Sequence, residues 1–205
     1  MGESETMTLR ERNKARARAD IADTALRLFH DRGFEGVTVD EIVRAAGVSR
    51  RTFFRYFETK EDALLADYPE LNTRLTETLE GSDSDEAMLA IRDGMHEMAK
   101  WYIDRSDAVL ARSKVIRDTP INLAARNLEF LTQWEQAIAN AVARQIGSDA
   151  SDLLPRTAAA MIVAAFRAAL TQWVRSSCGR SLHDLIDEAL DLIEDGLHAP
   201  LSTRR

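Results

Sequence analysis

The stretch from Thr38 to Asp62, TVDEIVRAAGVSRRTFFRYFETKED, constrains the fold of this chain more than any other. It carries five Lys and Arg residues within 25 positions. Thr38 followed by Glu41 matches a capping box, in which the threonine hydroxyl accepts from the backbone three residues on and the glutamate reaches back to the cap. Gly47 then supplies a residue that tolerates positive φ where a helix ends in a tight turn. These signals predict a short helix followed directly by a turn.

A second short helix is predicted after the turn, with Ser49 as its cap. Its apolar positions are Phe53, Phe54 and Phe57, and its cationic and phenolic positions are Arg50, Arg51, Arg55 and Tyr56. We expect one side of this helix to pack and the other to be cationic. Thr59 with Asp62 resembles the capping signature and opens a third helix, with Lys60 in its first turn. The pattern is that of a helix-turn-helix. The alternative, a hairpin buried in a larger bundle, would bury several cations at high cost.

The composition favours an all-α protein. The 205 residues are 45% hydrophobic and 30% charged, which is typical of a globular chain. They include four prolines and nine glycines, while Ala, Leu, Arg and Glu are frequent. Because these frequent residues favour helices and no convincing alternating strand pattern occurs, we expect helices throughout.

The charge is unevenly distributed along the chain. The formal net charge is −7, which by itself would argue against nucleic-acid binding. Residues 1–60, however, carry 12 Lys and Arg against 10 Asp and Glu, whereas the remainder carries 15 against 24. Since local charge decides phosphate binding, any polyanion is expected to bind the first part.

The sequence predicts a cytoplasmic protein with no membrane partner. A single cysteine, Cys178, excludes an internal disulfide framework and fits a reducing compartment. The N-terminus lacks the apolar core of a signal peptide. The longest strongly apolar run, between Arg156 and Arg167, is too short to span a bilayer.

Helical spacing divides the chain into about nine helices in two domains, residues 1–59 and residues 60–205. The first helix is expected from about Leu9 to Asp31, and Pro69 is expected to kink or break the helix that starts at Lys60. Later helices are expected from Asp83 or Ser84 to about Asp104, from Ser106 to before Pro120, from a Thr119 cap to Gly147, from Ser151 or Asp152 through AAAMIVAAFRAAL, and from Ser181 onward. The apolar segment is expected to be buried all round, and the last helix to be half buried.

A basic arm precedes the apolar stripe of the first helix. Its cations are Arg10, Arg12, Lys14, Arg16 and Arg18. Two interpretations stay open: a solvated helix start, or a contact with DNA phosphates or the minor groove.

Residues 17–64, ARADIADTALRLFHDRGFEGVTVDEIVRAAGVSRRTFFRYFETKEDAL, resemble the N-terminal domain of TetR-family transcriptional regulators. The resemblance implies a three-helix DNA-binding head, a larger helical ligand-binding body, and a homodimer formed by the last two long helices. The segments AAAMIVAAFRAALTQWV and SLHDLIDEALDLIEDGL resemble the mycofactocin-type branch, whose ligand domain is acyl-CoA-like. The implied function is that of a repressor released from a palindromic DNA operator by a hydrophobic small molecule, such as a long-chain acyl-CoA.

In the family pattern, the start of the second helix of the turn motif reaches bases in the major groove. The candidate base contacts are Ser49, Arg50, Arg51 and Thr52, and the candidate phosphate contacts are Thr38, Arg55, Tyr56 and Lys60. Arg50 can present two donors to guanine, and Thr52 can touch a thymine methyl. The family often has tyrosine where this chain has Phe54, and a phenyl ring cannot donate to a phosphate. Whether Phe54 contacts DNA or only packs against sugar or core stays open.

The body contains a set of large or flexible apolar side chains, which are individually typical of a core and collectively typical of an adaptable cavity. The candidate ligand-binding residues are Met95, Met98, Trp101, Tyr102, Phe130, Trp134, Met161 and Phe166. Arg126 and Arg167 could meet a carboxylate or phosphate of a ligand, or form surface ion pairs. The candidate dimer contacts are Leu170, Trp173, Leu182, Leu185, Ile186, Ala189 and Ile193.

The sequence contains no motif for catalysis, a cofactor or a metal. There is no glycine-rich phosphate loop and no nucleophile elbow, and the histidines are scattered. His183 with Asp184 and Asp187 is a faint metal arrangement, but these carboxylates fit the solvated face of the last helix better. The remaining alternatives are an architectural DNA-binding protein, and a helical ligand carrier or enzyme that does not bind DNA.

Overall fold

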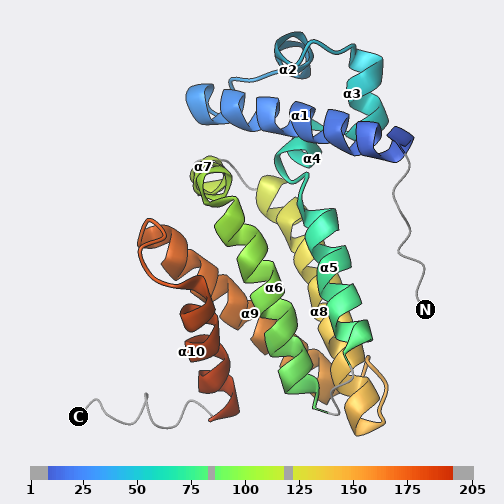
Figure 1. Cartoon of the computed structure of the whole chain (residues 1–205), viewed down its shortest axis with the longest axis vertical. Helices are drawn as coiled ribbons and strands as arrows, with labels where there is room; N and C mark the ends of the chain where they lie inside the picture. The colour runs from blue at the N-terminus through green and yellow to red at the C-terminus, as the bar shows by residue number, and fades with distance from the viewer. Residues whose placement is uncertain (1–8, 83–85, 118–121, 196–205) are drawn as a thin grey trace. The chain divides into compact units, whose positions relative to one another are not determined.

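The computed structural model describes residues 9–82, 86–117 and 122–195, and the side chains within residues 12–82, 86–117 and 130–195. Within these ranges every regular element is an α-helix, which confirms the all-α prediction (Figure 1). The helices are α1 Leu9–Arg32, α2 Val39–Ala45, α3 Arg50–Tyr56, α4 Lys60–Leu64, α5 Tyr68–Gly81, α6 Ala87–Asp104, α7 Ser106–Arg117, α8 Asn122–Ile146, α9 Leu153–Arg175 and α10 Leu182–Glu194. The helix starts predicted at Asp83 or Ser84, and at Thr119 with Pro120, lie outside the described residues.

The chain divides into two compact units. The first comprises residues 1–66 and 111–124, and the second comprises residues 67–110 and 125–205. The first unit therefore includes α4, which the sequence analysis assigned to the second domain. This is because α4 packs against α1 and buries Ala63 and Leu64 completely or nearly so.

The turn signals of the first unit form as predicted. Gly33 ends α1 with φ of 77°, and Gly47 follows α2 with φ of 67°. Thr38 and Glu41 form both hydrogen bonds of the capping box at the start of α2. Thr59 and Asp62 form a second capping box at the start of α4. The local sequence thus sets where these short helices begin and end.

The predicted interruption near Pro69 is confirmed. Leu65, Ala66 and Asp67 form a turn that separates α4 from α5, and Pro69 lies at the second residue of α5. A proline is tolerated at this position because the first turn of a helix has no intrahelical partner for its N–H. The break explains why the described residues contain ten helices where about nine were expected.

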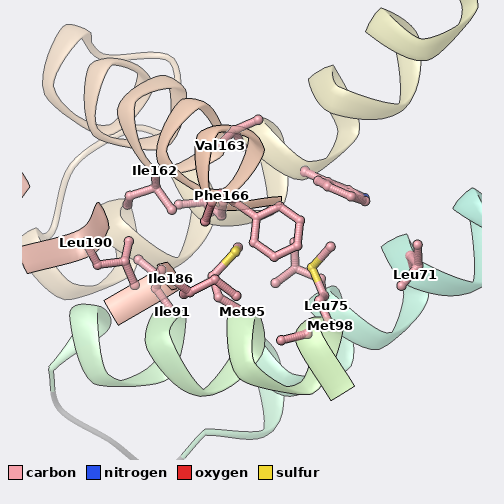
Figure 2. Close-up of a cluster of buried hydrophobic side chains, with 14 of the residues drawn as sticks. Leu71, Leu75, Ile91, Met95, Met98, Ile162, Val163, Phe166, Ile186 and Leu190 are labelled. Carbon is pink, nitrogen blue, oxygen red and sulfur yellow. The ribbon is translucent and has the colours of Figure 1, made fainter. Parts of the chain in front are cut away.

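The second unit is built around one hydrophobic core. It is formed by α5, α6, α8, α9 and α10, with α9 packed along α10 and α6 packed against both α5 and α10. Figure 2 shows Met95 of α6, Phe166 of α9 and Ile186 of α10 close together in this core. The backbone N–H of Ala87 at the start of α6 donates to Gln145 Oε1 of α8 (2.8 Å), so a long-range contact replaces a local cap.

The prediction that α9 is buried all round is wrong for the isolated chain. Ile162 and Phe166 are buried, but Leu154 and Met161 are 60% and 41% exposed. The face of α9 that does not contribute to the core is therefore open, because a single chain supplies core on one side only. By length and composition α9 is the one helix in the described ranges that could cross a membrane, a test that core helices of globular proteins also pass.

Candidate nucleic-acid interface and aromatic core

Helix α3 has one buried face and one exposed face. Phe53 is fully buried and packs against Phe57, with ring centroids 5.5 Å apart. Its exposed positions are Arg50, Arg51, Phe54 and Arg55. Phe54, which the sequence analysis counted among the apolar packing positions, is 46% exposed and touches Phe53 through a T-shaped contact of 5.4 Å. The exposed face of α3 is thus cationic with one aromatic ring in its middle.

Arg50 is held in place by two neighbours. Its guanidinium pairs with the carboxylate of Asp40 on α2, and it lies over the Phe54 ring, 5.5 Å from the centroid. The pair is exposed, so it contributes little to stability. It does, however, fix the direction of a side chain that would otherwise be highly flexible.

The hydroxyl groups at the start of α3 are committed to its cap. Ser49 Oγ accepts from the Thr52 N–H (3.1 Å) and also hydrogen-bonds Thr52 Oγ1 (2.9 Å). What Thr52 presents outward is therefore mainly its methyl group. Arg51, Thr52, Phe54 and Arg55 line a surface hollow of about 410 Å³.

Thr38 and Glu41 form a tight local network. Thr38 donates to Glu41 Oε2 through both its N–H and its hydroxyl, each at 2.9 Å, and Arg32 donates to Glu41 Oε1 at 2.6 Å. The backbone N–H of Thr38, followed by Arg32 and the Thr38 hydroxyl, lowers the pKa of Glu41 to about 2. The hydroxyl of Thr38 thus donates and accepts within the capping box, so its proton is not free to be donated to a phosphate.

Lys60 has a structural partner that the sequence did not predict. Its ammonium group donates to the backbone carbonyls of Phe34 (2.9 Å) and Val37 (3.1 Å), and it lies 4.3 Å from the centroid of the Phe34 ring. These contacts tie the start of α4 to the loop after α1. The phosphate contact predicted for Lys60 stays a prediction, and these two hydrogen bonds give the ammonium group a competing structural role.

The other predicted phosphate contacts form a pair. Arg55 donates to the Tyr56 hydroxyl (2.9 Å) and stacks over its ring at 4.7 Å. In the basic arm, which is part of α1, Arg12, Lys14 and Arg16 are exposed. The guanidinium carbon of Arg18 lies 5.1 Å from the centroid of the Phe57 ring, so this charged group packs on the ring that follows α3.

In the second unit, aromatic rings form a continuous line through the core. Phe130 contacts Tyr68 (5.0 Å), Tyr68 stacks on Trp134 (6.1 Å), and Trp134 meets Phe166 (5.8 Å). From Phe166 the line continues through Tyr102 (5.9 Å) to Trp101 (5.4 Å). The structure thus brings together most of the predicted ligand-binding residues, including Met95 and Met98, which are completely buried.

Among the side chains that the structure describes, two donors in this aromatic line have no hydrogen-bond partner. Trp134 and Trp101 are 2% and 4% exposed, and the indole N–H of each is buried and unpaired. The side-chain oxygen of Asn72 on α5 is also buried without a partner. Because nearly all buried polar groups in proteins are paired, such groups require an explanation.

Comparison with known proteins decides the family. Residues 21–66 match the model of bacterial regulatory proteins of the tetR family, and residues 85–198 match the model of the MftR C-terminal domain. The chain belongs to the TetR family. It is therefore a DNA-binding transcriptional regulator with a helix-turn-helix head, and its family is one of regulators, not of enzymes.

Three relatives illustrate this membership. The chain is 32% identical over 181 residues to the protein assigned as the mycofactocin biosynthesis transcriptional regulator MftR of Mycobacterium tuberculosis, covering 86% of this chain and 89% of that protein. It is 29% identical to the HTH-type transcriptional regulator TcmR of Streptomyces glaucescens, covering 93% of this chain and 88% of TcmR. The crystal structure of Thermus thermophilus FadR in complex with lauroyl-CoA has a TM-score of 0.64 and 25% identity, covering 88% of this chain and 94% of that chain.

Not every predicted ligand-binding residue of this TetR-family chain joins the aromatic core. Met161 and Arg167 lie on the exposed face of α9. They are separated from the core because they fall on the opposite side of the helix from Ile162 and Phe166. Arg126 lies outside the residues whose side chains the structure describes.

The predicted dimer residues all lie in or against the core of the second unit, and their role in a dimer stays a prediction. Trp173, Leu182, Leu185 and Ile186 are at most 5% exposed and belong to the core of their own chain. Leu170, Ala189 and Ile193 are half buried against the same core. The apolar stripe of α10 thus packs α10 onto α9 and α6, and its partly buried residues keep some surface open to a partner.

A cluster of ion pairs between α6 and α10 was not predicted from the sequence. Arg92 pairs with Asp187 (2.7 Å), Asp191 (2.8 Å) and Glu194 (3.0 Å), and His96 Nε2 lies 3.0 Å from Asp187. Partial burial alone would raise the pKa of Asp187, but the hydrogen bond from Arg92 and the attraction of His96 outweigh it and lower that pKa. Three carboxylates of α10, those of Asp187, Asp191 and Glu194, therefore bind α6 by ion pairs and do not form only a solvated face.

The described residues contain no group of three or more His, Cys, Asp or Glu arranged to hold a metal ion. His183 contacts the His96 ring edge-on at 5.1 Å, so it belongs to the α6–α10 contact. Arg92 and His96 are four residues apart on α6, and Asp187 and Asp191 are four residues apart on α10. Helical periodicity places each pair on one face of its helix, so it could have predicted these ion pairs.

Proposed function

We propose that this regulator is a homodimeric repressor that a hydrophobic acyl ligand, of the long-chain acyl-CoA class, releases from a palindromic operator. The observation that carries the ligand is the pair of unpartnered indole N–H groups of Trp101 and Trp134 inside an aromatic core. A carbonyl or thioester oxygen is an acceptor that such donors can bind, and the rings around them suit an alkyl chain. An acyl thioester combines both features.

The lauroyl-CoA complex of Thermus thermophilus FadR supports this choice, because it is a structural relative at 25% identity. An unpaired buried donor costs about 1–3 kcal/mol, so a ligand that pairs it would be stabilised by that amount relative to one that cannot. Ordered water is the competing partner for these donors. Trp134→Phe separates the two, because only a ligand contact predicts a weaker response of this variant to lauroyl-CoA.

The proposed dimer uses the open face of α9. Leu154 and Met161 lie seven residues apart, hence on one side of the helix, and both are exposed. Leu192 on α10 is 43% exposed as well. A two-fold dimer of this kind carries two α3 helices, so we expect a palindromic operator whose half-sites lie about one helical turn, or 34–36 Å, apart. The regulator is proposed to act in the cytoplasm.

In this mechanism the ligand and the operator favour two different arrangements of the same dimer. Linkage then requires each to weaken binding of the other by the same factor. The α4–α5 turn at Leu65–Asp67 is the proposed place where the arrangements differ, because it interrupts the helix and joins the two compact units.

The test begins with selection of an operator from a random duplex pool by the full-length protein. Fluorescence anisotropy then measures operator affinity with increasing lauroyl-CoA or stearoyl-CoA, with coenzyme A alone as the matched control. We expect the acyl thioesters to weaken operator binding and coenzyme A to leave it unchanged. Equal operator affinity with and without every acyl-CoA would exclude this ligand class, while leaving DNA binding itself intact.

A further inference from the structure

Phe54 is the one apolar side chain on the exposed face of α3. The other exposed members of this face are Arg50, Arg51 and Arg55. Isolated exposed apolar residues are ordinary on protein surfaces and need no explanation. The setting of Phe54 is different, because it lines the surface hollow together with Thr52 and two arginines, Arg51 and Arg55.

We infer that Phe54 reads a thymine methyl group in the operator and so sets sequence specificity. A phenyl ring offers no hydrogen-bond donor, hence it cannot make the phosphate contact available to the tyrosine that the family often has here. Within the major groove the apolar feature of a base edge is the thymine C5-methyl, and phenylalanine is among the side chains that contact it. This inference rests on the proposed placement of α3 in the major groove.

Arg50 ties this contact to a neighbouring base. Its guanidinium carbon lies 5.5 Å from the centroid of the Phe54 ring, and Asp40 holds it there. Because successive bases of one strand rise by about 3.4 Å, two side chains at this separation reach bases that are one or two base steps apart. If Arg50 binds guanine, the thymine read by Phe54 lies within about two base pairs of that guanine.

The surroundings of Phe54 also explain why its ring is directed outward. Phe53 meets it edge-on at 86° and fills the buried side, so the ring has no room in the core of the first unit. Replacing Phe54 is therefore expected to leave the fold intact, which makes it a suitable position for a test of specificity.

The test uses the full-length protein and the operator selected from the random duplex pool. Each thymine of the half-site is replaced in turn by deoxyuridine, which removes the methyl group and nothing else, and anisotropy measures the affinity. The wild-type protein is expected to lose about fourfold per half-site at one thymine, the equivalent of one buried methyl group at about 0.8 kcal/mol. Phe54→Ala is expected to bind the thymine and deoxyuridine duplexes equally at that position.

Two variants serve as controls. Phe54→Leu keeps an apolar contact and should keep part of the discrimination, which also guards against a folding defect in the alanine variant. Arg55→Ala, on the same exposed face, should weaken all duplexes alike and preserve the ratio. An unchanged ratio in Phe54→Ala, or a wild-type protein insensitive to every thymine methyl, would overturn the inference alone. Failure to enrich any duplex would overturn the operator proposal and this inference with it.

Discussion

Replacing Lys60 by methionine separates a structural role of this lysine from the phosphate contact that the sequence suggested. Methionine keeps much of the apolar stem and removes the ammonium group, together with its bonds to the carbonyls of Phe34 and Val37 and its contact with the Phe34 ring. Hydrogen bonds from a charged donor contribute about 1.5–3 kcal/mol each and a cation–π contact about 0.5–1 kcal/mol. These contributions sum to about 3.5–7 kcal/mol. Because the group is only partly buried, we discount this sum and expect a loss of about 2–4 kcal/mol.

The stability of the Lys60→Met variant is measured by urea unfolding followed by circular dichroism. Its operator affinity is measured in parallel across a salt series. Each phosphate contact contributes about 0.9 to the slope of log affinity against log salt. A structural Lys60 predicts a clearly destabilised protein whose slope is unchanged where it is folded. A phosphate-binding Lys60 predicts wild-type stability and a slope shallower by about 1.8, since a dimer would lose two contacts.

Arg55→Ala is the matched control for this experiment. Arg55 is exposed and pairs with the Tyr56 hydroxyl, so its removal should leave stability nearly unchanged and reduce the salt slope. A Lys60→Met variant with nearly unchanged stability and a reduced salt slope, as expected for Arg55→Ala, would refute the structural role of Lys60.

Three further predictions follow from the same structure. Trp134→Phe removes an unpaired buried donor as well as ring volume, so the stability of the ligand-free protein should stay within about 1 kcal/mol of wild type. Thermal-shift titration of this variant should show a weaker response to lauroyl-CoA. A response as strong as that of wild type would exclude this indole as a ligand contact. Arg92→Met removes three partly exposed ion pairs and should lower the free energy of unfolding by about 1–2 kcal/mol in low salt. Urea unfolding should show a smaller difference in 1 M NaCl, because salt screens the pairs. A difference that persisted in high salt would argue against a stabilising role of these ion pairs. Stability should also fall with acid: the folded pKa of Glu41 is about 2 against an ordinary value of 4.5, so its contribution is present above pH 4.5 and is lost as the pH falls toward 2. Glu41→Gln should flatten this part of the pH profile in thermal melts, and an unaltered profile would contradict the assignment.

Much of the first unit could be predicted from local sequence. Capping boxes at Thr38 and Thr59, and glycines at positions 33 and 47, act through neighbours within four residues. Such signals are readable because the partner atoms are close in the chain whatever the rest of the molecule does. For the same reason the amphipathic pattern of α3 identified Phe53 as a core residue.

Other assignments required the packed structure. The sequence placed Lys60 among the phosphate contacts because a cation after the turn motif looks free, and only tertiary contacts show that it binds carbonyls more than 20 residues away. Met161 and Phe166 are equally apolar, yet one lies on an open face and the other in the core. Periodicity could not separate them, since α9 is apolar on nearly every side.

The sequence by itself determined the helix-turn-helix, the all-α class and the family, because these depend on short-range caps, turns and composition. The tertiary structure decided which faces of α9 and α10 are buried and which ion pairs join Arg92 to α10. It also decided the aromatic line with its unpaired indoles and the outward direction of Phe54. The physical reason is that burial and hydrogen-bond partners across elements depend on which helices meet. That choice is set by the sum of many weak apolar contacts and not by any local motif.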